Sequence, residues 1–118
     1  MTDSPLIHKH CVPCEGGVPA ITGDALHKML SDVSEWDVVD DENTKIGRTF
    51  KFKDFVEGMI FVNAVAALAE EENHHPDFQI NYAKVTLTLW THAIGGLSEN
   101  DFILAAKIDQ LPEATAAK

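Results

Sequence analysis

Three of the six histidines in the chain lie within one stretch, EENHHPDFQINYAKVTLTLWTH, which runs from Glu71 to His92. His74 and His75 are adjacent near its start, and His92 ends it. Histidine is the side chain whose ordinary pKa, about 6.5, lies close to neutrality, so grouped histidines can accept and donate protons in one reaction. General acid–base catalysis is therefore one hypothesis for this pattern.

Two other interpretations of the same histidines stay open. In one, His74 and His75 are surface residues of a turn and His92 is a polar group at the end of a strand. In the other, the three rings bind a metal ion. Neighbouring residues on an extended backbone point to opposite sides, so an adjacent pair chelates one ion poorly, which makes the metal interpretation the weakest.

Carboxylates stand just before the histidine pair. Three consecutive glutamates, beginning at Glu70, occupy the end of a predicted helix, where the helix dipole disfavours negative charge. Such departures from a local rule are typical of functional sites. If the helix continues to His74, the carboxylate of Glu70 can reach that ring and orient it. Pro76 restricts His75 to an extended conformation and ends the helix before the pair.

The remaining pattern predicts the elements that position these residues. They are, in order, a helix that begins at Thr22 and fades near Val33, a hairpin of WDVVD and TKIGRTFKF around the DEN turn, a helix over about 54–72, a hairpin over about 78–92 and a helix that opens at Ser98. This order predicts an α+β fold. Its sheet is four-stranded and antiparallel, built from two hairpins, with three helices packed on one face.

The second predicted hairpin determines which residues meet. Its turn is expected at Tyr82 and Ala83, and residues equally far from that turn lie opposite one another. The neighbourhood of His75 therefore falls beside Trp90 and His92. Trp90 is by default a packing aromatic, and it can also line a site at this end of the hairpin.

The helix before the histidines is apolar on all sides, and not along one stripe only. Its apolar residues are Phe55, Val56, Met59, Ile60, Phe61, Val62, Val65, Ala66, Leu68 and Ala69. A helix that is apolar all round is buried all round, and so short a chain cannot cover both faces. We therefore expect a homodimer or homotetramer that associates through this helix. The alternative is a central helix wedged inside a monomer.

Composition excludes several classes of function. The chain has 118 residues, a formal net charge of −10 and a pI near 4.8, so nucleic acids and anionic membrane surfaces repel it. The longest mostly apolar run, Met59 to Ala69, is too short to span a bilayer, and the N-terminus lacks the apolar region of a signal peptide. We expect a cytoplasmic protein, with residues 1–21 as a polar extension and 22–118 as a single domain.

The polar extension contains a second candidate cluster, HKHCVPCEGG. Its possible zinc ligands are His8, His10, Cys11 and Cys14. Structural zinc sites usually draw their ligands from two separated knuckles, so a single CxxC favours a reduced, structural cysteine pair. No metal site is predicted.

The residues around the histidines resemble a known family, the pterin-4a-carbinolamine dehydratases. The shared pattern, with its spacing, consists of Glu70, the run His74-His75-Pro76, Tyr82, His92 and Asp101. The segments FKFKDF and GLSENDFILAAKID resemble the family as well, so the likeness spans about 22–111. Several residues at fixed spacings are a more specific signal than one short motif.

The resemblance implies a dehydratase that removes water from 4a-hydroxytetrahydropterin to give quinonoid dihydropterin, in tetrahydropterin recycling after aromatic amino-acid hydroxylation. It implies a pterin substrate, a functional link to an aromatic amino-acid hydroxylase and no cofactor. The acid–base residues it implies are His74, His75 and His92. The resemblance also implies that Glu70 is a supporting carboxylate and that Asp101 lies near the pterin. We add Asn73, Pro76 and Trp90, which lie close to the histidines in the sequence, as further supporting or substrate-binding candidates.

Two positions depart from the animal branch of the family. Relatives there often have aspartate and arginine where this chain has Asn73 and Asn100, which removes an ion-pair partner from Asp101. An alternative function is also implied, because members of the family act as binding proteins that stabilise the dimerisation of transcription factors. Such an assembly protein would use the apolar face of the second helix. The complete set of histidines favours the enzyme.

Overall fold

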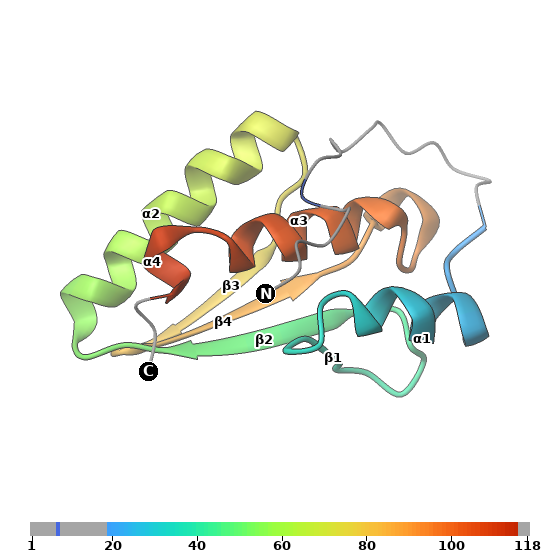
Figure 1. The fold of residues 1–118 in the computed structure, drawn as a ribbon, viewed down its shortest axis with the longest axis horizontal. Coiled ribbons are helices and arrows are strands. Elements are labelled where there is room, and N and C mark those ends of the chain that lie inside the picture. The colour runs from blue at the N-terminus through green and yellow to red at the C-terminus, as the bar shows by residue number, and fades with distance from the viewer. Residues whose placement is uncertain (1–6, 8–18, 116–118) are drawn as a thin grey trace.

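The computed structural model describes residue 7 and residues 19–115 (Figure 1). Its elements are, in order, α1 (Gly23–Ser31), β1 (Asp37–Val38), β2 (Ile46–Lys51), α2 (Phe55–Glu72), β3 (Asp77–Asn81), β4 (Lys84–Leu89), the 3-10 helix η2 (His92–Ile94), α3 (Glu99–Asp109) and α4 (Pro112–Thr115). The predicted α+β fold is confirmed. The N-terminal motif with Cys11 and Cys14 lies outside the described residues.

The sheet has the strand order β1-β2-β4-β3, and all of its strand pairs are antiparallel. The second hairpin has the predicted register, since Asp77 pairs with Thr88 and Asn81 with Lys84. Its turn falls at Tyr82, which has a positive φ of 53°. A two-residue loop of this kind suits the twist of antiparallel strands. The two hairpins join through β2 and β4 at the centre of the sheet.

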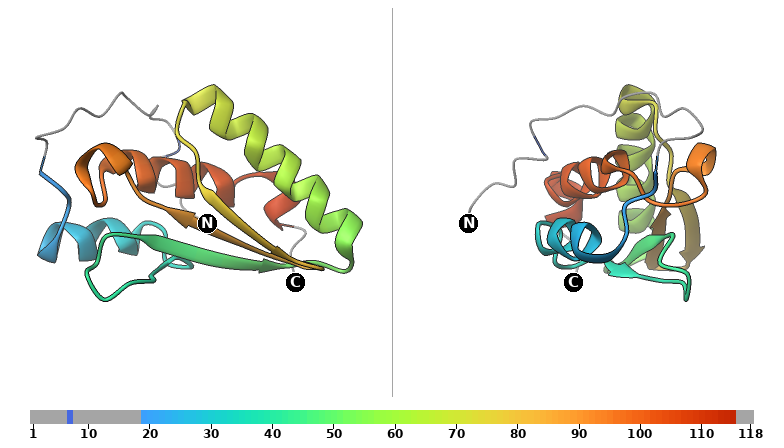
Figure 2. Two further views of the ribbon diagram at one scale, coloured as in Figure 1. Left: turned by 180° about the vertical axis from the view of Figure 1, so that it is seen from behind. Right: turned by 90° about the vertical axis from the view of Figure 1, so that its right-hand side faces the viewer.

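One face of the sheet packs against the helices and encloses the core. Figures 1 and 2 show α1, α2 and α3 on the same side of the sheet. On β4, Val85, Leu87 and Leu89 are completely buried and alternate with less buried residues, as the two-residue period of a strand requires. Between sheet and helices, the rings of Phe50 and Phe61 pack with their centroids 4.6 Å apart.

Helix α2 presents one apolar face inward and another outward. Phe61, Val65 and Ala69 are buried against the rest of the fold. Val56 and Ile60 are 64% and 52% exposed. The expectation that one subunit cannot cover both faces is confirmed. No helix within the described ranges has the length and hydropathy needed to cross a membrane.

The second hairpin is shorter than predicted. β4 ends at Leu89, and His92 opens η2 instead of ending a strand. The backbone leaves the ladder because the N–H of Thr91 donates to the carbonyl of Gly96 at 2.8 Å, which closes a loop where Gly95 has a φ of 65°. Helix α4 is also an addition to the predicted elements.

Helix α3 is fixed at both ends. It begins after Ser98, as predicted, and the carboxylate of Asp101 accepts a hydrogen bond from the backbone N–H of Ser98 at 2.9 Å. At the other end, Asp109 accepts from Nε1 of Trp36 at 3.0 Å and pairs with Nη1 of Arg48 at 2.7 Å. The Asp101 contact caps the first turn of α3, and the Asp109 contacts join its last turn to Trp36 and to Arg48 on β2.

Candidate active site

A cavity of about 490 Å³ opens where the α2–β3 link, the segment after β4 and the first turn of α3 meet. It is lined by Asn73, His74, His75, Pro76, Asp77, Trp90, Thr91, His92, Ala93 and Asn100. The predicted meeting of the histidine pair with Trp90 and His92 is therefore confirmed, whereas the chemical roles of these residues remain predictions. A volume of this order suits a small-molecule ligand.

The end of α2 decides how the histidine pair is presented. Asn73, the C-cap residue, adopts the left-handed conformation with a φ of 53°. The backbone N–H groups of Asn73 and His74 both donate to the carbonyl of Ala69. Asparagine tolerates this conformation better than most residues, so it suits this position. The chain consequently leaves the helix before it reaches His74.

The predicted contact between Glu70 and His74 is wrong. Glu70 Oε2 lies 2.5 Å from Nε2 of His75 instead. A contact between residues four apart needs both to be helical, and the left-handed turn at Asn73 directs His74 elsewhere. The side chains of His75 and Glu70 are 53% and 79% exposed, so water screens their interaction strongly.

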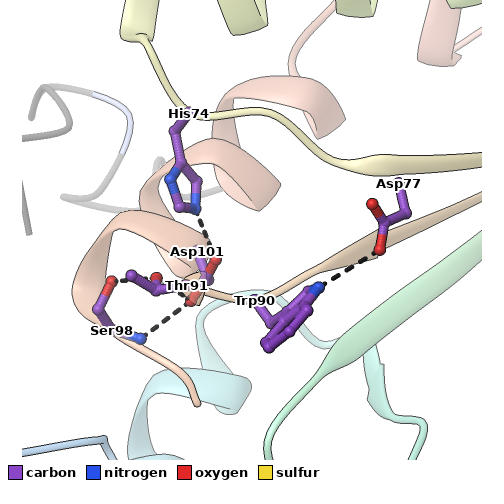
Figure 3. Close-up of polar contacts among 6 residues, drawn as sticks. All are labelled: His74, Asp77, Trp90, Thr91, Ser98 and Asp101. Atoms are coloured by element: carbon purple, nitrogen blue, oxygen red, sulfur yellow. Dashed lines mark hydrogen bonds and ion pairs between the residues drawn. The ribbon is translucent and has the colours of Figure 1, made fainter. Parts of the chain in front are cut away.

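His74 pairs with a buried carboxylate. Its Nε2 lies 2.6 Å from Oδ1 of Asp101, whose side chain is completely buried. Figure 3 shows the ring reaching from the α2–β3 link to Asp101 in α3. Asp101 is not among the lining residues and meets the cavity through its contact with His74, and its place near the pterin stays a prediction.

The other oxygen of Asp101 is held by two donors. Thr91 Oγ1 lies 2.9 Å from Oδ2, and the backbone N–H of Ser98 donates to the same oxygen at 2.9 Å. Thr91 Oγ1 also lies 2.7 Å from Ser98 Oγ. All three residues are buried, so little water competes for these hydrogen bonds. The carboxylate is thereby fixed in its orientation toward His74.

His92 is supported by an aromatic ring and not by a carboxylate. The rings of His92 and Trp90 have centroids 3.8 Å apart and planes inclined by 40°. Trp90 Nε1 donates to Oδ2 of Asp77 at 3.3 Å, and the ammonium of Lys45 lies 4.6 Å from the Trp90 ring centroid. Trp90 therefore lines the cavity, as expected, and is itself anchored from both hairpins.

Two of the three glutamates at the end of α2 contact side chains elsewhere in the fold. Glu72, which is 5% exposed, pairs with Nζ of Lys107 on α3 at 2.7 Å. Glu70 contacts His75, and Glu71 is exposed. The unfavourable charge at the helix end is thus offset for Glu72 by an ion pair that joins α2 to α3.

Sequence reasoning missed part of the lining. Asp77 and Thr91 each adjoin a predicted site residue, which was a usable signal, while Asn100 was noted only as a departure from relatives. Nothing in the sequence pattern marked Ala93. In the described ranges, no three His, Cys, Asp or Glu side chains are grouped so that they could hold a metal ion.

Known proteins resemble this chain over most of its length. A family model described as pterin 4 alpha carbinolamine dehydratase matches residues 19–111. A protein of Rubrobacter xylanophilus with the provisional name pterin-4-alpha-carbinolamine dehydratase is 45% identical, over 92% of this chain and 99% of its own. A protein of Chlorobaculum tepidum with the same provisional name is 48% identical, over 90% of this chain and 96% of its own.

Two solved structures resemble the fold. A transcriptional coactivator/pterin dehydratase from Brucella melitensis has a TM-score of 0.72 and 34% identity, and the match covers 77% of this chain and 96% of that one. A pterin dehydratase-like protein identified as a RuBisCO assembly factor in the alpha-carboxysome has a TM-score of 0.55 and 26% identity, over 64% and 86% of the two chains. With the family model and the curated relatives, these likenesses show that the chain belongs to the pterin 4 alpha carbinolamine dehydratase family.

Proposed function

We propose that this protein dehydrates 4a-hydroxytetrahydropterin to quinonoid dihydropterin by general acid–base catalysis with His74, His75 and His92. The observation that carries the proposal is the placement of all three histidines on one cavity, in a chain of this family. Each ring has a different support, so the three histidines can take different roles.

The reaction needs two proton movements and no redox step. One neutral imidazole takes the proton from N5, and the N5 electron pair forms a double bond to C4a. The C4a–O bond breaks, and an imidazolium donates a proton to the departing hydroxyl, which leaves as water. Each well-placed proton transfer typically contributes about 10²–10⁴-fold to the rate.

The other residues of the site position the rings and the pterin. The Trp90 ring offers an apolar face to a flat heterocycle, and the amide of Asn73 offers donors and an acceptor to its edge. Pro76 holds the chain extended after the pair. Glu70 orients His75, and Asp101 orients His74.

Self-association through the outward face of α2 is a second part of the proposal. Phe55, Val56 and Ile60 are 46%, 64% and 52% exposed on one helix, and contiguous apolar surface of this kind is typical of subunit contacts. A homodimer or homotetramer that covers this face removes it from water.

The alternative function is that of a binding or assembly protein without catalysis. It is favoured by the same exposed face of α2 and by the descriptions of the two similar structures as a coactivator and an assembly factor. That function would not depend on the histidines in the cavity, so substitutions there separate the two.

A stopped-flow assay of pterin-4a-carbinolamine dehydration tests the proposed activity. The wild-type protein should accelerate the reaction, and His92→Ala should lower the rate by about 10²-fold or more. His27→Ala is the matched control, because His27 is an exposed histidine on α1, outside the cavity, and its loss should leave the rate unchanged. A wild-type protein that does not exceed the spontaneous rate would exclude the dehydratase and favour the assembly function.

A further inference from the structure

We infer that Thr91 is a positioning residue that acts through Asp101 on His74, keeping the ring proton on Nε2 and leaving Nδ1 as the proton acceptor of that histidine. Thr91 belongs neither to the histidine set nor to the supporting residues expected from the sequence. The kinetic part of the inference rests on the proposed dehydratase activity. The part that concerns the ring proton does not.

The direction of each hydrogen bond follows from the chemistry of the groups. A carboxylate only accepts, so the single hydroxyl proton of Thr91 points to Oδ2 of Asp101, 2.9 Å away. The Thr91 oxygen must then accept in its 2.7 Å contact with Ser98 Oγ. The hydroxyls of Ser98 and Thr91 and the carboxylate of Asp101 therefore form one chain with a defined direction.

Because these groups are buried, removing one of their hydrogen bonds is costly. Asp101 is completely buried, and Thr91 and Ser98 are 4% and 7% exposed. A buried carboxylate that loses a donor is not readily compensated by water, and the cost of an unmet buried polar group is about 1–3 kcal/mol. Two donors hold Oδ2 of Asp101, the hydroxyl of Thr91 and the backbone N–H of Ser98. If the Thr91 hydroxyl is removed, the Ser98 N–H remains, and the carboxylate can rotate.

The orientation of the carboxylate determines the tautomer of His74. Oδ1 of Asp101 lies 2.6 Å from Nε2, and because the carboxylate accepts, Nε2 carries the proton. The second ring nitrogen, Nδ1, forms no hydrogen bond with any residue that the structure describes. His74 lines the cavity, so Nδ1 is the nitrogen left to accept a proton there.

The test compares Thr91→Val with Thr91→Ser and with the control Thr86→Val. Valine keeps the shape of threonine without its hydroxyl, and serine keeps the hydroxyl. Thr86 lies on β4, five residues before Thr91, and its hydroxyl bonds to Thr49 on the exposed side of the sheet, away from the cavity. Thr91→Val should lower kcat by about 10-fold or more with little change in KM, since misplacement of a reacting group by about 1 Å can cost about 10²-fold. Thr91→Ser should recover most of the rate, and Thr86→Val should match wild type.

Nitrogen-15 NMR of the histidine rings gives a readout independent of activity. The His74 signals are assigned by their loss in His74→Gln. In the wild-type protein the neutral ring should be the Nε2–H tautomer, and in Thr91→Val a mixture of both tautomers should appear. A wild-type ring in the Nδ1–H form would overturn the inference even if Thr91→Val fails to fold.

The outcomes separate this inference from the proposed function. An active protein whose rate and His74 tautomer are unchanged by Thr91→Val would refute the role of Thr91 and leave the dehydratase in place. An inactive wild-type protein in which the substitution still mixes the tautomers would support the positioning role and refute the function. Thr91→Ser losing as much rate as Thr91→Val would show that packing, and not the hydroxyl, is responsible.

Discussion

The three histidines of the cavity differ in what holds each ring. His74 contacts the completely buried Asp101, His75 contacts the exposed Glu70, and His92 packs on Trp90. Water and salt weaken a charge interaction at an exposed site far more than at a buried one. The residue that supports His74 should therefore contribute more than the residue that supports His75.

Two carboxylate-to-amide substitutions test this difference. Asp101→Asn should lower kcat by about 10²-fold, because an amide cannot accept from His74, Thr91 and Ser98 at once. Glu70→Gln should change kcat by less than about threefold, since its contact is screened. Stopped-flow rates check both, with thermal unfolding to confirm that each variant is folded. Equal losses in the two variants would contradict the argument.

The identity of the histidines was predictable from the sequence, but their partners were not. Glu70 was expected to contact His74. Because Asn73 adopts the left-handed conformation, Glu70 contacts His75 instead. Spacing along a helix predicts neighbours only while the helix lasts. The contact of His74 with Asp101 joins segments that are distant in sequence, so only the packing of α3 against the end of α2 creates it.

At the scale of elements, the site depends on how α2, α3 and the hairpins are held together. The Glu72–Lys107 pair links α2 to α3 directly beside Asn73, and its side chains are 1% and 13% exposed. Removing one partner of a buried ion pair leaves the other charge in a poorly solvated place. The ion pair therefore holds the end of α2 against α3, at the point where the α2–β3 link with His74 and His75 begins.

Lys107→Ala should lower the free energy of unfolding by about 3 kcal/mol, because it strips the buried Glu72 of a charged partner. Lys53→Ala is the matched control, since Lys53 pairs with Glu57 at 3.6 Å on the surface, with side chains 64% and 38% exposed. The control should lose less than about 1 kcal/mol. Urea unfolding measures both, and a similar loss in the two variants would refute the role assigned to the buried pair.

Two glycines in the elements should respond oppositely to alanine. A Cβ at Gly58, inside α2, would lie 3.6 Å from Val85 Cγ2, an ordinary contact, so Gly58→Ala should stabilise the fold by about 0.5–1 kcal/mol. A Cβ at Gly47 on β2 would lie 3.1 Å from the carbonyl oxygen of Leu87 and 2.9 Å from Val39 Cγ1, so Gly47→Ala should destabilise it by about 1 kcal/mol. Urea unfolding decides, and changes of the same sign would contradict the packing argument.

The register of the second hairpin was predictable because alternation and a two-residue turn determine it locally. The end of β4 was not. The position where β4 ends depends on the backbone hydrogen bond between Thr91 and Gly96. A pattern of side-chain types does not predict such a backbone contact. This is why His92 was expected in a strand and lies in η2.

At the scale of the whole molecule, the apolar residues of α2 exceed what one copy can bury. The fold class was predictable because the order of helices and strands allows few arrangements, with the helices on one face of the sheet. The number of copies in solution does not follow from that order. It depends on how well the outward face of α2 matches itself.

Ile60→Glu should reduce the mass of the protein in solution toward that of a single chain, because a charge at the centre of an apolar contact is costly to bury. Val39→Glu is the matched control, since Val39 is 52% exposed, as Ile60 is, and lies outside α2. Light scattering at micromolar concentration should give an oligomer for wild type and Val39→Glu. A monomeric wild-type protein would contradict self-association through α2.

The central claim is that the histidines catalyse dehydration by proton transfer without a metal. Adjacent histidines chelate one ion poorly, and the nitrogen lone pair of a carbinolamine already helps to expel the hydroxyl. The most direct test is the dehydration rate of the exhaustively chelated protein beside that of His92→Ala. We predict a full rate after chelation and a loss of about 10²-fold or more in the variant. Activity that chelation abolishes and zinc restores, together with a wild-type rate in His92→Ala, would contradict the claim.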